Sequence, residues 1–507
     1  MPFNPVEQRL LDLAGNWNTF RSDPVKRLLI WQAEENARRF YQCFFEIQKY
    51  ETEYTVGDLF IVFDTPFQNA IQYSRVLKET LSGQYLASRE DLKQQGISPD
   101  WKFNPEEYPN STSGFVQSLL SFGSSHHKNI GYLVAVFMPT EVTDNEAFEA
   151  WLGRVLAGLL PERLRFVVID SLNNPRLIKL IAAEDPLVQV DSPKIDALTT
   201  AQETFAQEKT VGPAGVFRNL LIGLMTLVER GNSEQVKIKA ADALKFARKQ
   251  NWADQEVVIA MLVAGSLLKE KRFEEALKDY QAARQAAEKA TVNGHPSGRE
   301  LILQTWFGQA AVHIAAGEFE KAAKCYDEAA ILAPQIPNLI LGVEAFRMGC
   351  FCFNRMNETD AAIDRGHKAV KLGTRLKPEA RIMTTMPIAA IDLLRAMDPE
   401  RVRQMEDIKY HQKIQIENSR KNAEQRNIKL EQTSDPEPFR IIEDGLKQET
   451  LQAELTATEQ LAFCIAEASQ PFKQAIINAD ELLGASWLLN TLMATPLEKA
   501  AQGADAP

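Results

Sequence analysis

Several classes of protein are excluded by what this sequence lacks. The five cysteines, Cys43, Cys325, Cys350, Cys352 and Cys464, are scattered and odd in number, which argues against a disulfide framework or a zinc site. Nowhere do 18 consecutive apolar residues occur, and the first residues contain no basic segment followed by a long apolar stretch. We therefore expect neither membrane insertion nor a cleaved signal, and we expect a cytoplasmic protein.

Positive charge is also scarce. Against 68 Asp and Glu residues stand 57 Lys and Arg, so the net charge is −11. An acidic surface repels phosphate backbones, and nucleic acid is therefore not the expected partner. The chain has 507 residues, of which 45% are hydrophobic and 25% charged. This is the composition of a globular chain with two to four structural units.

Catalytic and metal-binding motifs are missing as well. The histidine pair His126 and His127 has no HExxH or Cys-His spacing around it. Asp64 and Asp170 each follow an apolar run, where an aspartate most often caps the next turn. We find no G-x-S-x-G motif and no Ser-His-Asp arrangement. The sequence therefore predicts a protein that is not an enzyme and that needs no metal or cofactor.

Three short apolar runs, at residues 59–63, 132–138 and 164–169, alternate with helical patterns. Runs of this kind are typical of strands buried on both faces, so we predict a small parallel sheet in an α/β domain at residues 53–205. Leu28, Trp31, Phe40 and Phe44 recur at intervals of three or four and predict a long amphipathic helix over residues 24–51, in an N-terminal helical segment at 1–52.

The first apolar run leads into "FDTPFQNAIQYSRVL", which has the outline of a strand, a loop and a helix. A phosphate-binding loop needs glycines and a lysine, but this turn has neither, and Pro66 removes a backbone donor. The α/β domain resembles a degenerate P-loop nucleoside triphosphatase whose loop has lost its phosphate-binding residues. The resemblance leaves open an alternative function, a nucleotide-dependent switch with a repeat sensor.

Residues 213–397 are helical in pattern throughout, with breaks at near-regular intervals. In "AAGEFEKAAKCYDEAAILAP", at 315–334, small and aromatic residues keep fixed spacings. Over the 34 residues that begin at Leu303, the positions of this spacing are occupied by Trp306, Ala310, Gly317, Ala322, Tyr326, Ala329 and Pro334. Matching positions recur at Ala264, Ala276, Tyr280 and Ala362.

This spacing resembles the tetratricopeptide repeat, in which two antiparallel helices meet at small residues. The resemblance implies an α-solenoid with a concave surface that binds a protein partner. The basic residues that grip a C-terminal carboxylate in this family are missing here. The predicted groove is instead lined mainly by the apolar residues Met261, Leu268, Phe307, Ile314 and Phe351, and it also includes Arg347 and Arg355.

An apolar groove fits an amphipathic or hydrophobic segment. We therefore predict a non-enzymatic adaptor or scaffold, such as a chaperone or loading factor. Two alternatives stay open: the chain's own C-terminal helices fill the groove, or the protein is a structural subunit that associates with itself or with a larger assembly. We further predict a charged helical spacer at 398–435, a C-terminal helical segment at 436–495 and a disordered tail at 496–507.

Overall fold

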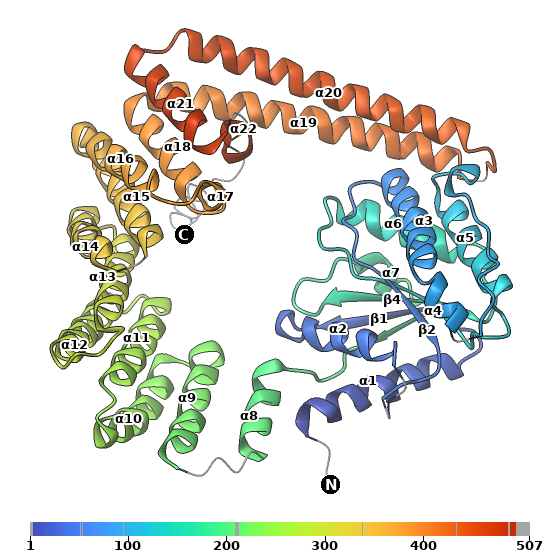
Figure 1. Ribbon diagram of the computed structural model, residues 1–507, viewed down its shortest axis with the longest axis horizontal. Coiled ribbons are helices and arrows are strands. Elements are labelled where there is room, and N and C mark those ends of the chain that lie inside the picture. Colours follow the sequence, from blue (N-terminus) through green and yellow to red (C-terminus); the bar gives the residue numbers. More distant parts are fainter. Residues whose placement is uncertain are drawn as a thin grey trace. The chain divides into compact units, whose positions relative to one another are not determined.

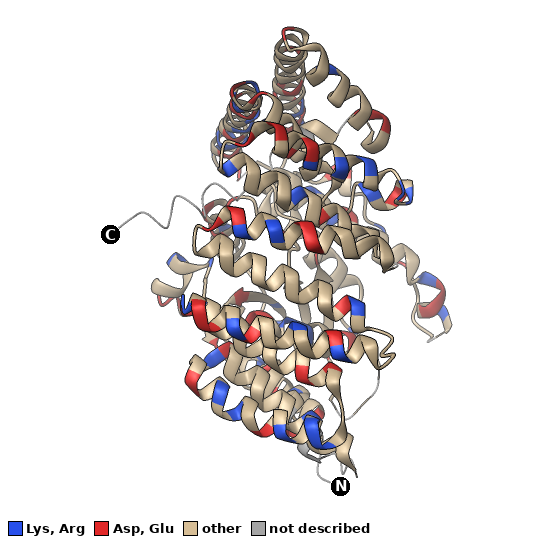
Figure 2. Ribbon diagram, turned by 90° about the vertical axis from the view of Figure 1, so that its left-hand side faces the viewer, with Lys and Arg blue, Asp and Glu red and all other residues tan. Residues whose placement is uncertain are grey.

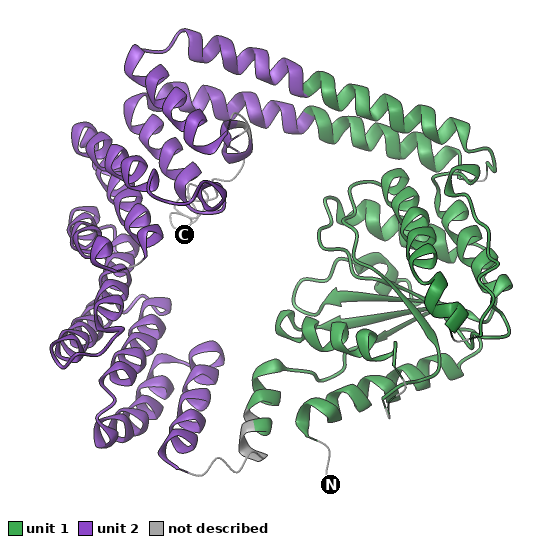
Figure 3. Cartoon of the chain, viewed as in Figure 1, with its two compact units in different colours: residues 1–208, 415–453 green, residues 209–414, 454–507 purple. Residues whose placement is uncertain are grey.

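The computed structural model describes residues 4–50, 52, 54–94, 96–207, 212–336, 338–431, 433–484 and 487–492, so the predicted tail lies outside the described residues. It confirms the predicted fold class, an α/β domain with a small parallel sheet followed by a helical solenoid (Figure 1). The chain divides into two compact units (Figure 3). Unit 1 contains Met1–Glu208 and Gln415–Ala453, and unit 2 contains Lys209–Ile414 and Glu454–Pro507.

Unit 1 is built on a parallel sheet with the strand order β2-β3-β4-β1-β5. The strands are β1 (Leu28–Ala33), β2 (Leu59–Phe63), β3 (Leu133–Phe137), β4 (Leu164–Ser171) and β5 (Val188–Asp191). The three runs predicted as strands therefore form β2, β3 and β4. The strands β1 and β5 complete the sheet, and β1 lies between β4 and β5.

The prediction of one helix over residues 24–51 is wrong. The chain there forms strand β1, the short 3-10 turn η1 (Glu35–Ala37) and helix α2 (Arg38–Ile47). The first four residues of β1 are all buried, as a strand in the middle of a covered sheet requires. Helical spacing between Leu28, Trp31 and the phenylalanines of α2 was therefore a coincidence between two separate elements.

Alternate residues of the strands enter two different hydrophobic clusters. Leu28 and Ile30 belong to a cluster with α3 (Ala70–Ala87), α5 (Thr112–Ser125) and α6 (Asn145–Leu156), whereas Leu29 and Trp31 belong to one with α1 (Pro5–Ser22) and α2. Each face of the sheet is thus covered by helices. The remaining short helices of this part are α4 (Arg89–Gln94), η2 (Pro105–Glu107), α7 (Ile178–Ala182) and α8 (Ala197–Gln207).

A buried lysine fixes the long connection before α5. Lys78, on α3, is fully buried, and its Nζ donates to the carbonyl oxygens of Pro105, Tyr108 and Pro109 at 3.0, 2.5 and 3.0 Å. Burial lowers the pKa of Lys78 to about 8. The segment rich in proline and asparagine is therefore tied to α3 by its backbone.

Unit 2 begins with antiparallel helical hairpins that pack in sequence order. Their helices are α9 (Pro213–Arg230), α10 (Ser233–Gln250), α11 (Ala253–Lys269), α12 (Phe273–Val292), α13 (Gly298–Ala315), α14 (Phe319–Leu332), α15 (Leu339–Arg355) and α16 (Thr359–Gly373). The short turn η3 (Ala333–Gln335) follows α14, and α17 (Pro378–Arg381) and α18 (Met386–Met397) follow α16. Acidic and basic side chains are interspersed along these helices (Figure 2).

Two long helices follow, α19 (Pro399–Lys429) and α20 (Glu437–Ala466), and each has residues in both units. In the part of α19 at 415–429, Ala423 and Asn427 are buried and most other side chains are exposed or half-buried. Helices α21 (Gln470–Leu483) and α22 (Trp487–Thr491) end the described chain and pack on α18.

Candidate functional site: the stacked helical repeats

Small residues hold the two helices of the third hairpin together. Ala310, on α13, and Ala322, on α14, are both fully buried and lie in one cluster with Tyr326. Gly317 connects the helices with a φ of 74°, a left-handed conformation that favours glycine. Pro334 lies in η3, directly after α14. The residues that define the repeat in the sequence are thus at the contacts between helices.

The other residues predicted to pack between helices are also buried or partly buried. Ala264, Ala276, Ala329 and Ala362 are fully buried, and Tyr280 is nearly so. Trp306 is partly buried, and the guanidinium of Arg284 lies 3.6 Å from the centre of its ring. Close contacts between alanines bring neighbouring helices together, as the repeat requires.

The apolar residues predicted for the groove are all half-buried and flank two clusters of the repeats. Met261 and Leu268 are half-buried and pack against the cluster of the first two hairpins. Phe307 lies edge-on to Tyr326, at 5.5 Å between ring centres. Ile314 and Phe351 are also half-buried and flank the cluster around Ala310.

Two arginines were predicted for the same surface, but the structure places them differently. Arg355 is exposed, and its guanidinium lies 5.4 Å from the centre of the Phe319 ring. Arg347 is buried, and it forms ion pairs with Glu344 at 2.5 Å and Asp392 at 3.1 Å. Since its donors are engaged inside the protein, we leave Arg347 out of the proposed surface.

The C-terminal helices occupy another part of unit 2. Phe472, Trp487 and Leu488 lie in a cluster with Ile391 and Leu394 of α18. That cluster contains none of the predicted groove residues within the described part of the chain. Phe463, a residue of the C-terminal helices that the alternative of a self-filled groove would bury, is 66% exposed. The described C-terminal helices therefore cover the end of the repeat array.

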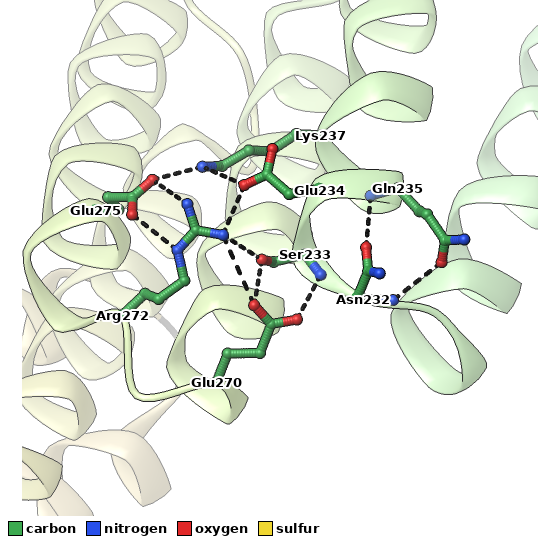
Figure 4. A network of polar contacts seen from close by, with 8 residues as sticks. All are labelled: Asn232, Ser233, Glu234, Gln235, Lys237, Glu270, Arg272 and Glu275. Carbon is green, nitrogen blue, oxygen red and sulfur yellow. Dashed lines mark hydrogen bonds and ion pairs between the residues drawn. The ribbon is translucent and has the colours of Figure 1, made fainter.

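A polar network that the sequence did not reveal joins the first two hairpins (Figure 4). Arg272 donates to Glu234 and Glu275 at 2.6 and 2.7 Å, and Lys237 also donates to Glu275, at 2.6 Å. Arg272, followed by Lys237, lowers the pKa of Glu275 to about 2. The contacts link the start of α10 to the start of α12, so they fix the angle between successive hairpins.

Further members of this network cap helix α10. The backbone N–H of Ser233 donates to Glu270 at 2.6 Å. Asn232 accepts from the N–H of Gln235 at 3.0 Å, and Gln235 accepts from the N–H of Asn232 at 3.1 Å. This reciprocal capping box satisfies donors that a helix start leaves free.

The loop that we compared with a phosphate-binding loop faces a carboxylate of the same chain. Asn69 caps α3, and the N–H of Ala70 donates to Oε2 of Glu424 at 3.2 Å. The other oxygen of Glu424 accepts from Arg154 at 2.7 Å. An acidic side chain thus lies at the helix start where an anion would otherwise be stabilised.

Asp170 and three of the cysteines lie in environments that explain them structurally. Both carboxylate oxygens of Asp170 accept from the N–H of Arg176, at 3.1 and 3.0 Å, so this aspartate caps the turn after β4. Burial raises the pKa of the thiols of Cys325, Cys350 and Cys352, to about 11, 12 and 12. Among the described residues, no group of three or more His, Cys, Asp or Glu side chains could hold a metal ion.

Comparison with known proteins agrees with the repeat. The family model of the tetratricopeptide repeat matches residues 304–336. No curated protein matches the sequence. In the part of the chain that the structure describes, no helix is both long and apolar enough to cross a membrane.

Three solved structures are similar to this chain. BtubC from P. vanneervenii has 15% identity over 39% of this chain and 80% of its own, with a TM-score of 0.32. The apo form of RapI has 12% identity over 65% and 85%, with a TM-score of 0.34. A signal transduction ATPase (STAND) with a tetratricopeptide repeat sensor from Pyrococcus horikoshii has 13% identity over 96% and 87%, with a TM-score of 0.23. TM-scores this low say nothing about function. What the repeat match and the packed alanines support is that residues 304–336 form a tetratricopeptide repeat.

Proposed function

We propose that the protein is a non-enzymatic adaptor of the cytoplasm that holds a protein partner on its helical repeats. The observation that supports this most directly is the half-buried apolar surface of Met261, Leu268, Phe307, Ile314 and Phe351, which unit 2 leaves partly exposed in the described residues. Stacked helical hairpins present such surfaces to protein partners. The buried thiols and the capped Asp170 supply no reactive group beside it.

The chemistry of this surface indicates the kind of partner. It is lined by aromatic and aliphatic side chains, and Arg355 is its exposed charged group among the predicted residues. A segment with apolar side chains on one face, an amphipathic helix or a hydrophobic strand, would remove these side chains from water. Neither mode needs a free carboxylate on the partner.

Two charge substitutions test the proposal. Phe307→Glu and Phe351→Glu each place a carboxylate on the surface, and burying an unpaired charge opposes binding of an apolar segment. Ile331→Glu is the matched control, because Ile331 is 66% exposed on α14 and lies outside the proposed surface. Each tagged variant is used to capture partners from the native lysate, which are identified by mass spectrometry.

The proposal predicts that the two phenylalanine variants lose the partners that wild type and the control retain. Circular dichroism and thermal unfolding establish that each variant is folded. If a folded double variant captures the same partners as wild type, this surface is not the binding site.

A further inference from the structure

Residues Gln415–Ala453, from the second half of α19 to the first half of α20, belong to unit 1 although residues 209–414 separate them from its other segment (Figure 3). We call this stretch the docked hairpin. Three of its carboxylates contact helices α3, α5 and α6 of the α/β domain. No pattern in the sequence indicates these contacts, because each of them joins residues more than 260 positions apart.

The first carboxylate, Glu424, lies on α19, and the second, Glu431, lies just after the end of this helix. Glu424 accepts from the N–H of Ala70, at the start of α3, and from Arg154. Glu431 accepts from the N–H of Ser113, at the start of α5, at 3.1 Å, and from the hydroxyl of Thr112. Carboxylates at helix starts are stabilised by the helix dipole and by donors that the helix leaves free.

The third carboxylate comes from α20. Glu443 is 7% exposed, and it accepts from Arg75 at 2.7 Å and from Asn110 at 3.1 Å. Arg440 adds a bond to the carbonyl oxygen of Glu106 at 2.6 Å. The surface below the hairpin therefore presents two helix starts and two arginines, a set of donors that matches an acidic helical segment.

The docked hairpin also buries apolar side chains, among them Phe439, which is 0% exposed. One cluster of four buried side chains, Ile71, Ala423, Ile442 and Leu446, joins it to α3, with Leu430 packed beside them. The two clusters on the faces of the sheet contain no residue of the hairpin within the described chain. The α/β domain therefore has its own hydrophobic core without the hairpin.

The docked hairpin also buries an amide without a hydrogen-bond partner. Asn427, on α19, is fully buried, and neither its Nδ2 nor its Oδ1 has a hydrogen-bond partner. An unpaired buried amide opposes burial, because water would satisfy both atoms. Burial also raises the pKa of Glu424, despite the ion pair with Arg154.

Hydrogen bonds and ion pairs thus make up most of the named contacts between the docked hairpin and the α/β domain. We propose that the surface formed by the starts of α3 and α5 with Arg75 and Arg154 is a docking site for a helical hairpin that carries carboxylates at matching positions, and that the chain's own residues 415–453 occupy it reversibly. The hairpin leaves this site as a unit while the sheet stays folded. This inference does not depend on the proposed partner of the repeats.

Hydrogen exchange on the full-length chain tests the proposal. Reversible docking predicts that peptides containing the N–H groups of Ala70 and Ser113 exchange at least tenfold faster than peptides of strand β3, because they open locally. The double variant Glu424→Lys/Glu443→Lys should accelerate their exchange at least tenfold further and leave β3 unchanged. Adding Arg75→Glu and Arg154→Glu to it should restore slow exchange.

Two single variants complete the test. Asn427→Leu removes the unpaired amide and should slow exchange at Ala70 and Ser113. Glu449→Lys is the matched charge reversal, because Glu449 is exposed on the same hairpin and lies near Arg426, at 4.0 Å. Glu449→Lys should leave exchange at both Ala70 and Ser113 unchanged. The proposal is overturned if Ala70 and Ser113 exchange as slowly as β3 in wild type, or if the double lysine variant accelerates β3 equally.

Discussion

The ring of Tyr280 fills the space where a side chain on Gly308 would lie. A Cβ atom built on Gly308 would come within 2.2 Å of Cε1 and 2.5 Å of Cζ of that ring. Tyr280 comes from α12 and Gly308 from α13, so the contact joins two successive hairpins. Tyr280 is 7% exposed, which leaves the ring little room to move.

We therefore expect Gly308→Ala to destabilise the repeats by about 1 to 3 kcal/mol, as overpacking of a close contact does. Gly265→Ala is the control, because Gly265 lies within α11 and a Cβ there would meet nothing within 4 Å. That change should stabilise the helix by roughly 0.5 to 1 kcal/mol. Urea unfolding of both variants measures the difference, and two equal effects would contradict the close contact.

Removal of the buried arginine should cost more than removal of the exposed one on the same helix. Arg347→Met leaves Asp392 buried with Arg395 as its nearest charged partner, at 3.0 Å, and we expect a loss of about 3 kcal/mol. Arg355→Met removes an exposed guanidinium beside Phe319 and should cost under about 1 kcal/mol. Thermal or urea unfolding compares the two variants, and similar losses would refute a structural role for Arg347.

The stability of the α/β domain should rise with pH between 8 and 10.5. The pKa of Lys78 is about 8 in the folded chain and 10.5 as the ordinary value. Because it is lower in the folded state, its contribution to stability is present above pH 10.5 and is lost as the pH falls to 8. The full difference is on the order of 3 kcal/mol.

Lys78→Met identifies the part of this pH dependence that belongs to Lys78. We expect urea unfolding of wild type to show a larger increase in stability between pH 8 and pH 10 than unfolding of the variant. Exchange of the β3 amides reports on the α/β domain specifically. Parallel pH profiles of the two proteins would show that the lysine is not desolvated by folding.

Acid should weaken the connection between the first two hairpins. The pKa of Glu275 falls from 4.5 to about 2 in the folded chain, chiefly through Arg272. Its contribution to stability is therefore present above pH 4.5 and is lost as the pH falls through 2. Arg272→Gln should lower stability at pH 5 but have a smaller effect at pH 2.5, measured by urea unfolding. An effect of constant size would argue against the ion pair.

The repeats could be predicted from the sequence because their contacts are local. Ala310 and Ala322 lie 12 positions apart, in adjacent helices of one hairpin, and only small residues permit that approach. Arg347 was misplaced because its partner Asp392 lies beyond the repeat that was being compared.

The docked hairpin and strand β1 could not be predicted in this way. Arg154 meets Glu424 across 270 positions, and a single sequence gives no sign of such a pair. The run of Leu28 to Trp31 was visible, but Phe40 and Phe44 continued its spacing and favoured a helix. Apolar runs this short fit either structure, and only the strands on either side decide between them.

The central position of β1 has a consequence for synthesis of the protein. Its two neighbours, β4 and β5, begin at Leu164 and Val188. Translation at about 5 to 20 residues per second delays their emergence from the ribosome by on the order of ten seconds. Throughout that interval the apolar strand Leu28–Ala33 lacks both of its native neighbours in the sheet, so its burial must wait until most of the α/β domain has been synthesised.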